Sequence, residues 1–293
     1  MTRVPVAGSG VRTVSGLEAV SLGLMIGGCR LAFAGPSALG GRGRELGRFA
    51  RRLARLGGAL VQVESDRAAA LFAAGASLAG ARSVALVADG GAAVAALAGL
   101  EDLAPVLVDL SDSLPLHLSG VRVMLAPYSA RTAFAAGYAA GRHAADMGGP
   151  GLIAGLAGLE GALPLSSERV LGDEPPLPFA HRGPDDPDLL LLSAGPGYGA
   201  CDEARQRLEA AGVTCAHLHL WQLAPFPGAI IAPVVTSARA VLVVEPGERG
   251  TLAGHVRCHL GAPAAPLHQL FPTVGVRPGP DAIVRRAMEV VRR

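Results

Sequence analysis

Three ionisable side chains lie within four positions in the segment Gln62–Ala69, "QVESDRAA". Two of them, Glu64 and Asp66, stand between an apolar run and an alanine-rich stretch. Carboxyl groups placed in this way suit proton transfer in a catalytic site. They also suit a plainer role, because Ser65 and Asp66 are favourable N-cap residues for a helix that begins here. The residue types alone leave both interpretations open.

A second acidic segment, "VDLSDS", places Asp109 and Asp112 on either side of Ser111. It follows an apolar strand pattern, and ligands of α/β proteins usually bind at the carboxyl ends of strands. Each acid is equally compatible with a solvated loop or a helix cap, which is the interpretation that we favour.

A glycine-rich segment, "SAGPGYGACDEA", has Gly195, Gly197 and Ala200 in the spacing G-x-G-x-x-[GA] of dinucleotide-binding proteins. That motif also requires an acid about 20 residues further on, at the end of the next strand. The next strand pattern ends "HLHLWQL" and contains no carboxylate, so a tight strand-to-helix turn is the better interpretation. The sequence contains no G-x-S-x-G, P-loop or H-E-x-x-H motif, so nothing in it supports a hydrolase or a kinase.

The four cysteines lie far apart, which favours reduced cytosolic thiols over a disulfide framework. Only "HVRCH", with His255, Cys258 and His259, suggests a metal, and it lacks a second ligand pair at a suitable spacing. We therefore expect no metal site in this chain. A [4Fe–4S] cluster needs a tighter cysteine array, so any such cluster would belong to a partner.

The length and composition of the chain limit the kind of fold that can hold these candidate residues in place. The chain has 293 residues, enough for two domains, and half of them are apolar although only 4% are aromatic. A net charge of +2 argues against nucleic acid as the main partner. The apolar stretch Leu17–Leu39 is interrupted by Glu18 and Arg30, so we expect neither an export signal nor a membrane span. The chain is predicted to be cytoplasmic.

Short apolar strands alternate with helices along the first half, which is typical of a doubly wound parallel sheet covered on both faces. The predicted strands are residues 31–35, 59–64, 83–89, 104–111, 121–127 and 149–157, and the predicted helices are residues 13–30, 43–58, 66–80, 91–101 and 129–147. Ser15 and Glu18 have the spacing of a capping box. The helix 43–58 is amphipathic, with its apolar face formed by Leu46, Phe49, Leu53 and Leu56.

The composition changes in the proline- and acid-rich segment 163–187, which is typical of a linker. The alternation then resumes, with predicted strands 189–195, 213–220 and 240–245 and predicted helices 201–212, 227–236, 250–260 and 281–293. The sequence thus predicts two α/β domains, residues 1–162 and the smaller 188–293, joined by that linker.

Read together, these motifs resemble the alpha subunit of 2-oxoacid:ferredoxin oxidoreductases, which oxidise 2-oxo acids with thiamine diphosphate. The segment "SGLEAVSLGLMIGGCRLAFAGPS" is similar to the family's opening helix, strand and Tyr-Pro-Ile-Thr-Pro loop. "VQVESDRAAALFAAGASLAGARS" is similar to the following segment, Gln-x-Glu-x-Glu-x-Ala-Ala and Ala-Gly-Ala-Arg. "YGACDEARQRLEAAGVTCAHLHLWQLAPFP" is similar to the transketolase-C-like domain. The resemblance covers about residues 12–293 and implies a pyrimidine-binding-type thiamine fold followed by a transketolase-C-like domain.

The resemblance also implies roles for individual residues. The family's second carboxylate contacts the aminopyrimidine ring of the cofactor; this position falls on Asp66, and Glu64 falls on the first acid. The family's Tyr-Pro-Ile-Thr-Pro loop falls on the segment with Pro36 and Ser37. Its Thr-Ser-Gly-Pro-Gly loop falls on "VADGG", which contains three expected cofactor contacts, Asp89, Gly90 and Gly91.

Several positions depart from the family pattern. Asp66 is one methylene shorter than Glu, which leaves its carboxyl about 1.5 Å short of the ring, and an error of that size can cost about a hundredfold in rate. The family's loop threonine falls on Ala38. The Arg-Gly-Gly-Pro-Ser-Thr-Gly stretch has no counterpart after "VLVDLSDS". The set of substrate ligands is therefore incomplete, and the sequence does not identify the 2-oxo acid.

The leading hypothesis is an alpha-like subunit of a thiamine-diphosphate-dependent 2-oxoacid:ferredoxin oxidoreductase-type complex. It implies a heterodimer or heterotetramer with a beta subunit that carries the diphosphate-binding domain, Mg²⁺ and a [4Fe–4S] cluster, and ferredoxin as electron acceptor. The site is either active, with Asp66 or Glu64 as the acid, or degenerate. Two alternatives are a non-catalytic structural subunit and a two-chain thiamine-dependent decarboxylase or transketolase-like enzyme.

Overall fold

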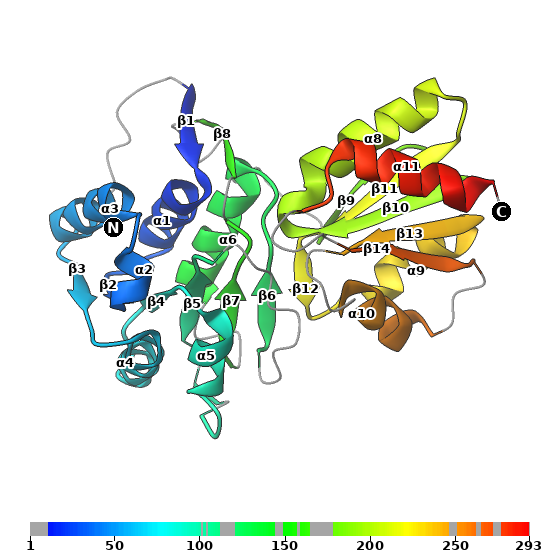
Figure 1. Cartoon of the computed structure of the whole chain (residues 1–293). Helices are drawn as coiled ribbons and strands as arrows, with labels where there is room; N and C mark the ends of the chain where they lie inside the picture. Colours follow the sequence, from blue (N-terminus) through cyan, green and yellow to red (C-terminus); the bar gives the residue numbers. More distant parts are fainter. Residues whose placement is uncertain are drawn as a thin grey trace. The chain divides into compact units, whose positions relative to one another are not determined.

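The computed structural model describes residues 11–100, 102–103, 105–111, 121–143, 149–156, 159–164, 178–245, 251–261, 265–271 and 277–292 (Figure 1). The chain divides into two compact units, Met1–Pro176 and Leu177–Arg293. The division falls inside the segment 163–187 that we predicted as a linker, of which residues 165–177 lie outside the described residues.

Parallel strands form the sheet of the first unit. Their order is β6 (Val123–Leu125), β7 (Gly151–Ile153), β5 (Val106–Asp109), β4 (Ser83–Val87), β2 (Leu31–Ala34) and β3 (Ala59–Gln62). The central strands β4 and β5 are buried along their whole length, as expected for a sheet that is covered on both faces. A separate antiparallel pair is formed by β1 (Val11–Ser15) and β8 (Glu160–Pro164).

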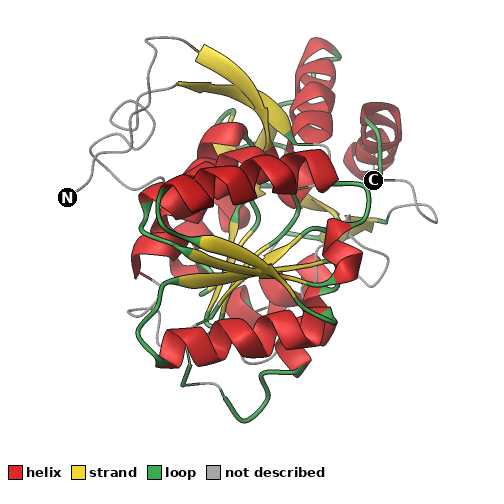
Figure 2. Cartoon of the chain, turned by 90° about the vertical axis from the view of Figure 1, so that its left-hand side faces the viewer, coloured by secondary structure: helices red, strands yellow, loops and turns green. Residues whose placement is uncertain are grey.

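Helices cover both faces of this sheet, as Figure 2 shows. They are α1 (Gly16–Ile26), α2 (Pro36–Leu39), α3 (Gly43–Arg55), α4 (Asp66–Leu78), α5 (Gly90–Ala95) and α6 (Ala130–His143). Their starts follow from local capping. The side chains of Ser15, Ser65 and Asp89 accept backbone N–H bonds from the first turns of α1, α4 and α5.

Helices α1 and α6 pack closely because glycines face backbone atoms of the opposite helix. A Cβ atom at Gly23 would lie 2.1 Å from the Phe134 carbonyl oxygen, and one at Gly137 would lie 2.3 Å from the Val20 carbonyl oxygen. No side chain fits at either distance. These glycines are therefore required by the packing of the two helices.

The second unit has its own sheet, in the order β14 (Leu267–Leu270), β13 (Ala240–Val244), β10 (Leu189–Ala194), β11 (Cys215–Leu220) and β9 (Phe179–Arg182). Only β9 is antiparallel to its neighbour. The helical elements are the 3-10 turn η2 (Gly195–Gly197), α8 (Tyr198–Ala210), α9 (Gly228–Ser237), α10 (Thr251–Leu260) and α11 (Pro280–Val291). A further short strand, β12, spans Gln222–Ala224.

The two-part α/β architecture agrees with the prediction, whereas several element boundaries differ. The predicted helix 13–30 is divided into strand β1 and the shorter helix α1. The predicted linker contains strand β9, and the strands β8, β12 and β14 were not predicted. Among the described residues, no helix combines the length and the apolar character needed to span a membrane.

Candidate functional site

The strand order of the first unit makes the carboxyl ends of β2 and β4 a topological switch point, and we call this edge of the sheet the crevice. The chain leaves β2 for the edge strand β3 on one side, and then returns to β4 on the other side. In open α/β sheets, ligands bind at such a switch point. Pro36 and Ser37 follow β2, and Asp89, Gly90 and Gly91 follow β4, so these five expected cofactor contacts lie at the same edge of the sheet.

Asp66 lies in this crevice, at the first position of α4. Its Oδ2 accepts backbone N–H bonds from Ala88 at 2.7 Å and from Asp89 at 3.0 Å. Its Oδ1 is buried and accepts no hydrogen bond from any described residue. A Cβ atom on Gly35 would lie only 2.5 Å from this Oδ1, so the carboxylate rests directly against the backbone that follows β2.

The carboxylate of Asp109 also binds the loop Ala88–Gly90, which follows β4. Asp109, at the end of β5, is 1% exposed. Its Oδ1 accepts the Ser111 N–H at 2.8 Å, and it also accepts the backbone N–H of Gly90. Burial raises the pKa of Asp109, and nearby Asp89 adds to this effect, while the two N–H donors oppose it. Asp112 lies outside the described residues.

Glu64 is placed differently from Asp66. It is exposed, and it forms no hydrogen bond or ion pair with any described residue. Pro36 and Ser37 are also exposed, and Asp89 caps α5 through its Oδ1 and the Ala92 N–H at 2.9 Å. The predicted site residues are thus brought to one edge, but the acid expected to face a cofactor is the one that is bound to the protein backbone.

A buried polar cluster in the second unit was not predicted as a unit. Ser193 Oγ lies 2.8 Å from His217 Nε2 and 2.8 Å from His219 Nδ1, and all three residues are fully buried. Burial lowers the pKa of His217 to about 4 and lowers the pKa of His219 as well. Alternate positions on β11 and the matching position on β10 place these side chains on the face that α8 covers. Because no part of the cluster reaches solvent, it supports packing rather than catalysis.

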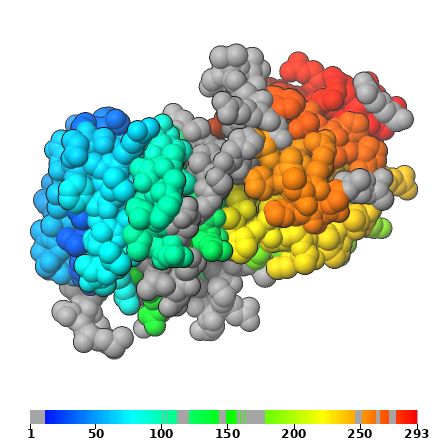
Figure 3. All heavy atoms as spheres, turned by 90° about the horizontal axis from the view of Figure 1, so that it is seen from below, coloured from blue at the N-terminus to red at the C-terminus, as the bar shows by residue number. Residues whose placement is uncertain are grey.

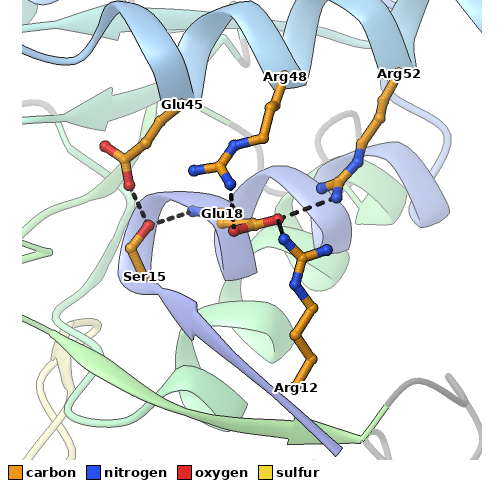
Figure 4. Close-up of polar contacts among 6 residues, drawn as sticks. All are labelled: Arg12, Ser15, Glu18, Glu45, Arg48 and Arg52. Carbon is orange, nitrogen blue, oxygen red and sulfur yellow. Dashed lines mark hydrogen bonds and ion pairs between the residues drawn. The ribbon is translucent and has the colours of Figure 1, made fainter. Parts of the chain in front are cut away.

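A charged cluster joins β1, α1 and α3, as Figure 4 shows. The Glu18 carboxylate is 8% exposed and pairs with Arg52 at 3.0 Å, Arg12 at 3.5 Å and Arg48 at 4.0 Å. Ser15 accepts the Glu18 N–H at 3.2 Å, which confirms the N-cap half of the predicted capping box. The Glu18 side chain instead holds the arginines, so its role is to fix α3 against α1.

The metal candidates of the sequence are arranged differently in the structure. On α10, His259 stacks on the Phe226 ring at a centroid distance of 4.7 Å, and the His255 ring lies tilted to Phe226 at 6.0 Å. Within the described part of the chain, no group of three or more potential ligands is placed to hold a metal ion. Burial raises the pKa values of Cys29, Cys201 and Cys215 to about 12, so these thiols are unreactive.

Helix α4 and strand β3 carry large apolar side chains that are exposed. We call this set the α4 patch; it consists of Val61 (40% exposed), Leu71 (45%), Phe72 (51%) and Leu78 (74%). The Phe72 ring stacks on buried Phe33 at 5.6 Å, and Val61 is the partner of Phe33 in the neighbouring strand, so Phe72 and Val61 both adjoin Phe33. Figure 3 shows the cyan atoms of this region at the surface of the first unit.

Two solved structures have the same fold as this chain. One is a 2-oxoglutarate:ferredoxin oxidoreductase from Magnetococcus marinus with 2-oxoglutarate, coenzyme A and succinyl-CoA bound. The TM-score is 0.78 and the identity 18%, and the match covers 96% of this chain and 65% of that chain. The other is a split-gene transketolase, solved as an inactive beta4 tetramer. Its TM-score is 0.72 and its identity 16%, and the match covers 95% of this chain and 98% of that chain.

These likenesses confirm the predicted fold, a pyrimidine-type doubly wound unit followed by a transketolase-C-like unit. The chain spans just under two thirds of the length of the oxidoreductase chain. No protein-family model matches the sequence, and a search of curated proteins finds no match. The fold therefore rests on three-dimensional similarity at low sequence identity.

The residues in the crevice do not fit the aminopyrimidine contact that the sequence resemblance implies. An acid in that role needs an oxygen that a ring nitrogen can reach. In this chain, Asp66 Oδ2 already accepts two N–H bonds, and Oδ1 is enclosed beside Gly35. No catalytic step through this carboxylate follows from the geometry.

Proposed function

We propose that this chain is an alpha-like subunit of a 2-oxoacid:ferredoxin oxidoreductase-type complex. In this proposal the complex oxidatively decarboxylates a 2-oxo acid with thiamine diphosphate. A beta subunit carries the diphosphate-binding domain, Mg²⁺ and the [4Fe–4S] cluster, and ferredoxin accepts the electrons. The four cysteines are free thiols, three of them buried, which suits the cytoplasmic location that we propose for the complex.

The α4 patch is the observation that carries this proposal. Leu78 is 74% exposed and Phe72 is 51% exposed, on the same helix whose first residue lies in the crevice. The three exposed apolar side chains of α4, Leu71, Phe72 and Leu78, form a surface that a second chain would shield from water. A partner that packs on Phe72, about 9 Å along the helix from Asp66, would also lie near the carboxyl edge of the sheet, whereas Leu78 lies about 18 Å from Asp66, toward the amino edge. The proposed beta subunit therefore completes the site and covers the patch at the same time.

Reconstitution tests the proposal. The chain is co-expressed with the chain encoded by the neighbouring gene, and the mass of the complex is measured by sedimentation. Phe72→Asp and Leu78→Asp should weaken association by about 100-fold or more, because each places a charge in an apolar interface. Ile230→Asp is the matched control, since Ile230 is 55% exposed in the second unit and lies outside the patch. Equal association of all three variants would contradict the proposal.

The activity of the reconstituted complex separates the candidate reactions. Reduction of ferredoxin that requires a 2-oxo acid supports the oxidoreductase. Turnover without ferredoxin or coenzyme A instead supports a two-chain decarboxylase or transketolase-like enzyme. This second candidate is favoured by one specific observation, namely that the likeness to the split-gene transketolase extends over 98% of that chain. A complex that assembles without binding thiamine diphosphate would support the structural subunit.

A further inference from the structure

We infer that Asp66 is a structural clamp that closes the crevice between β2 and β4, and that its own carboxyl does not act as the acid for a thiamine ring. The inference rests on the proposed function and deepens it, because it assigns Asp66 a non-catalytic part in the complex. It starts from the position of the side chain. Asp66 touches the backbone after β2 on one side and the backbone after β4 on the other.

The hydrogen bonds of Asp66 leave little of the carboxylate available. One carboxylate oxygen has two lone-pair positions, and the N–H groups of Ala88 and Asp89 take both positions of Oδ2. Oδ1 is buried, and the backbone at Gly35 approaches it so closely that even a methyl group there would overlap it. A ring nitrogen would have to displace either the loop after β4 or the turn after β2.

The loop after β4 is held from both ends by carboxylates. Asp66 accepts the N–H groups of Ala88 and Asp89, and Asp109 accepts the N–H of Gly90. Three consecutive backbone donors thus point at two aspartates. An arrangement in which all donors are satisfied is stable and specific, and moving either carboxylate leaves backbone N–H groups without partners. Asp66 therefore acts as a positioning residue for the Ala88–Gly90 loop.

Amide hydrogen exchange in the full-length chain tests the clamp directly. Asp66→Ala should accelerate exchange at Ala88 and Asp89 by about tenfold or more, because both N–H groups lose a charged acceptor. Asp66→Asn should have a smaller effect, since its side-chain oxygen still accepts. Glu64→Ala is the matched control, an exposed acid two residues away without contacts among the described residues. Unchanged exchange in Asp66→Ala would overturn the clamp. If Asp66→Ala does not fold, faster exchange at the same two amides in Asp66→Asn supports the clamp, and unchanged exchange overturns it.

Binding of thiamine diphosphate with Mg²⁺ to the reconstituted complex tests the second part of the inference. We expect Asp66→Asn to bind the cofactor with the affinity of the native complex. A loss of affinity of tenfold or more in that variant, with native amide exchange at Ala88 and Asp89, would show that Asp66 faces the ring. The exchange measurement needs no partner chain. Failure of the complex to assemble would therefore contradict the proposed function and leave the inference about Asp66 unaffected.

Discussion

The buried histidine pair should make the second unit sensitive to mild acid. His217 and His219 are fully buried around the Ser193 hydroxyl, which can accept from an N–H of one ring and donate to the other ring only while the accepting nitrogen is unprotonated. Burial lowers the pKa of His217 from 6.5 to about 4 in the folded chain. The pKa of His219 is lowered in the same direction, first by burial and then by His217.

The sign of the effect follows from proton binding. Between pH 6.5 and pH 4, the unfolded chain binds a proton at His217 that the folded chain does not bind. The contribution to stability is therefore fully present above pH 6.5 and is lost as the pH falls toward 4. A shift of one pKa unit corresponds to about 1.4 kcal/mol, so His217 alone removes about 1 kcal/mol between pH 6 and pH 5 and roughly 3 kcal/mol over the whole range. His219 adds to this loss with the same sign.

Urea unfolding at pH 7, 6 and 5 measures this dependence. Trp221, the single tryptophan, is 6% exposed in the second unit, so its fluorescence reports the unfolding of that unit. His217→Gln keeps a polar partner for Ser193 but removes the titrating group. In this variant the free energy of unfolding should fall by about 1 kcal/mol less between pH 6 and pH 5 than in the native chain. His259→Gln makes the same substitution at an exposed histidine of α10, outside the buried pair, and is the control. Parallel pH dependence in the native chain and His217→Gln would refute the reasoning.

Two further predictions concern the packing of the first unit. Gly137→Ala should lower the free energy of unfolding by about 1–3 kcal/mol, because its Cβ would lie 2.3 Å from a backbone oxygen of α1. Gly47→Ala, in the open middle of α3, should instead raise the free energy of unfolding by about 0.5–1 kcal/mol. Equal effects of Gly137→Ala and Gly47→Ala in thermal unfolding would contradict the packing argument. Glu18→Gln should cost about 1–2 kcal/mol by leaving three partly exposed arginines without their counter-charge. Because salt screens the remaining repulsion, the loss measured by urea unfolding should be smaller at 1 M ionic strength, and a salt-independent loss would point to packing instead.

The elements with a strong local pattern could be predicted from the sequence. Leu46, Phe49 and Leu53 recur with helical spacing, and all three are buried beneath α3. The strands β4 and β10 are apolar except for one serine each, and both are fully buried. In these segments the local pattern and the tertiary environment favour the same structure, which explains why the two-part α/β fold was predictable.

The missed strands depend on partners that are distant in the sequence. Strand β1 pairs with β8, about 150 residues away, and its residues Thr13–Ser15 continue without a break into helix α1. Strand β9 lies at the edge of its sheet and includes His181 and Arg182, so it lacks the apolar run of a central strand. Pairing with β11 decides its structure, and no local pattern records that pairing.

In the candidate site, too, the partners of a single carboxylate are distant in the sequence and cannot be predicted from the local pattern. The sequence places Asp66 correctly at the start of a helix after a strand, but β3 and β4 are not neighbours, because β2 lies between them. Only the passage of α4 across β2 brings the carboxylate to the N–H groups that follow β4. The second unit repeats this use of a strand-end acid. Glu245, 1% exposed after β13, accepts the N–H groups of Leu252 and Ala253 at 2.9 and 3.0 Å.

A carboxylate at the end of a parallel strand is therefore ambiguous in a sequence, since catalysis and loop anchoring require the same residue at the same place. The distinction lies in where its two oxygens are directed. Both oxygens of Glu245 accept hydrogen bonds from the protein, and those of Asp66 are either bound or enclosed. By this criterion the two acids belong together as anchors of the segment that follows a strand. Glu64, exposed and without contacts among the described residues, is the acid of the crevice edge that stays open to a partner.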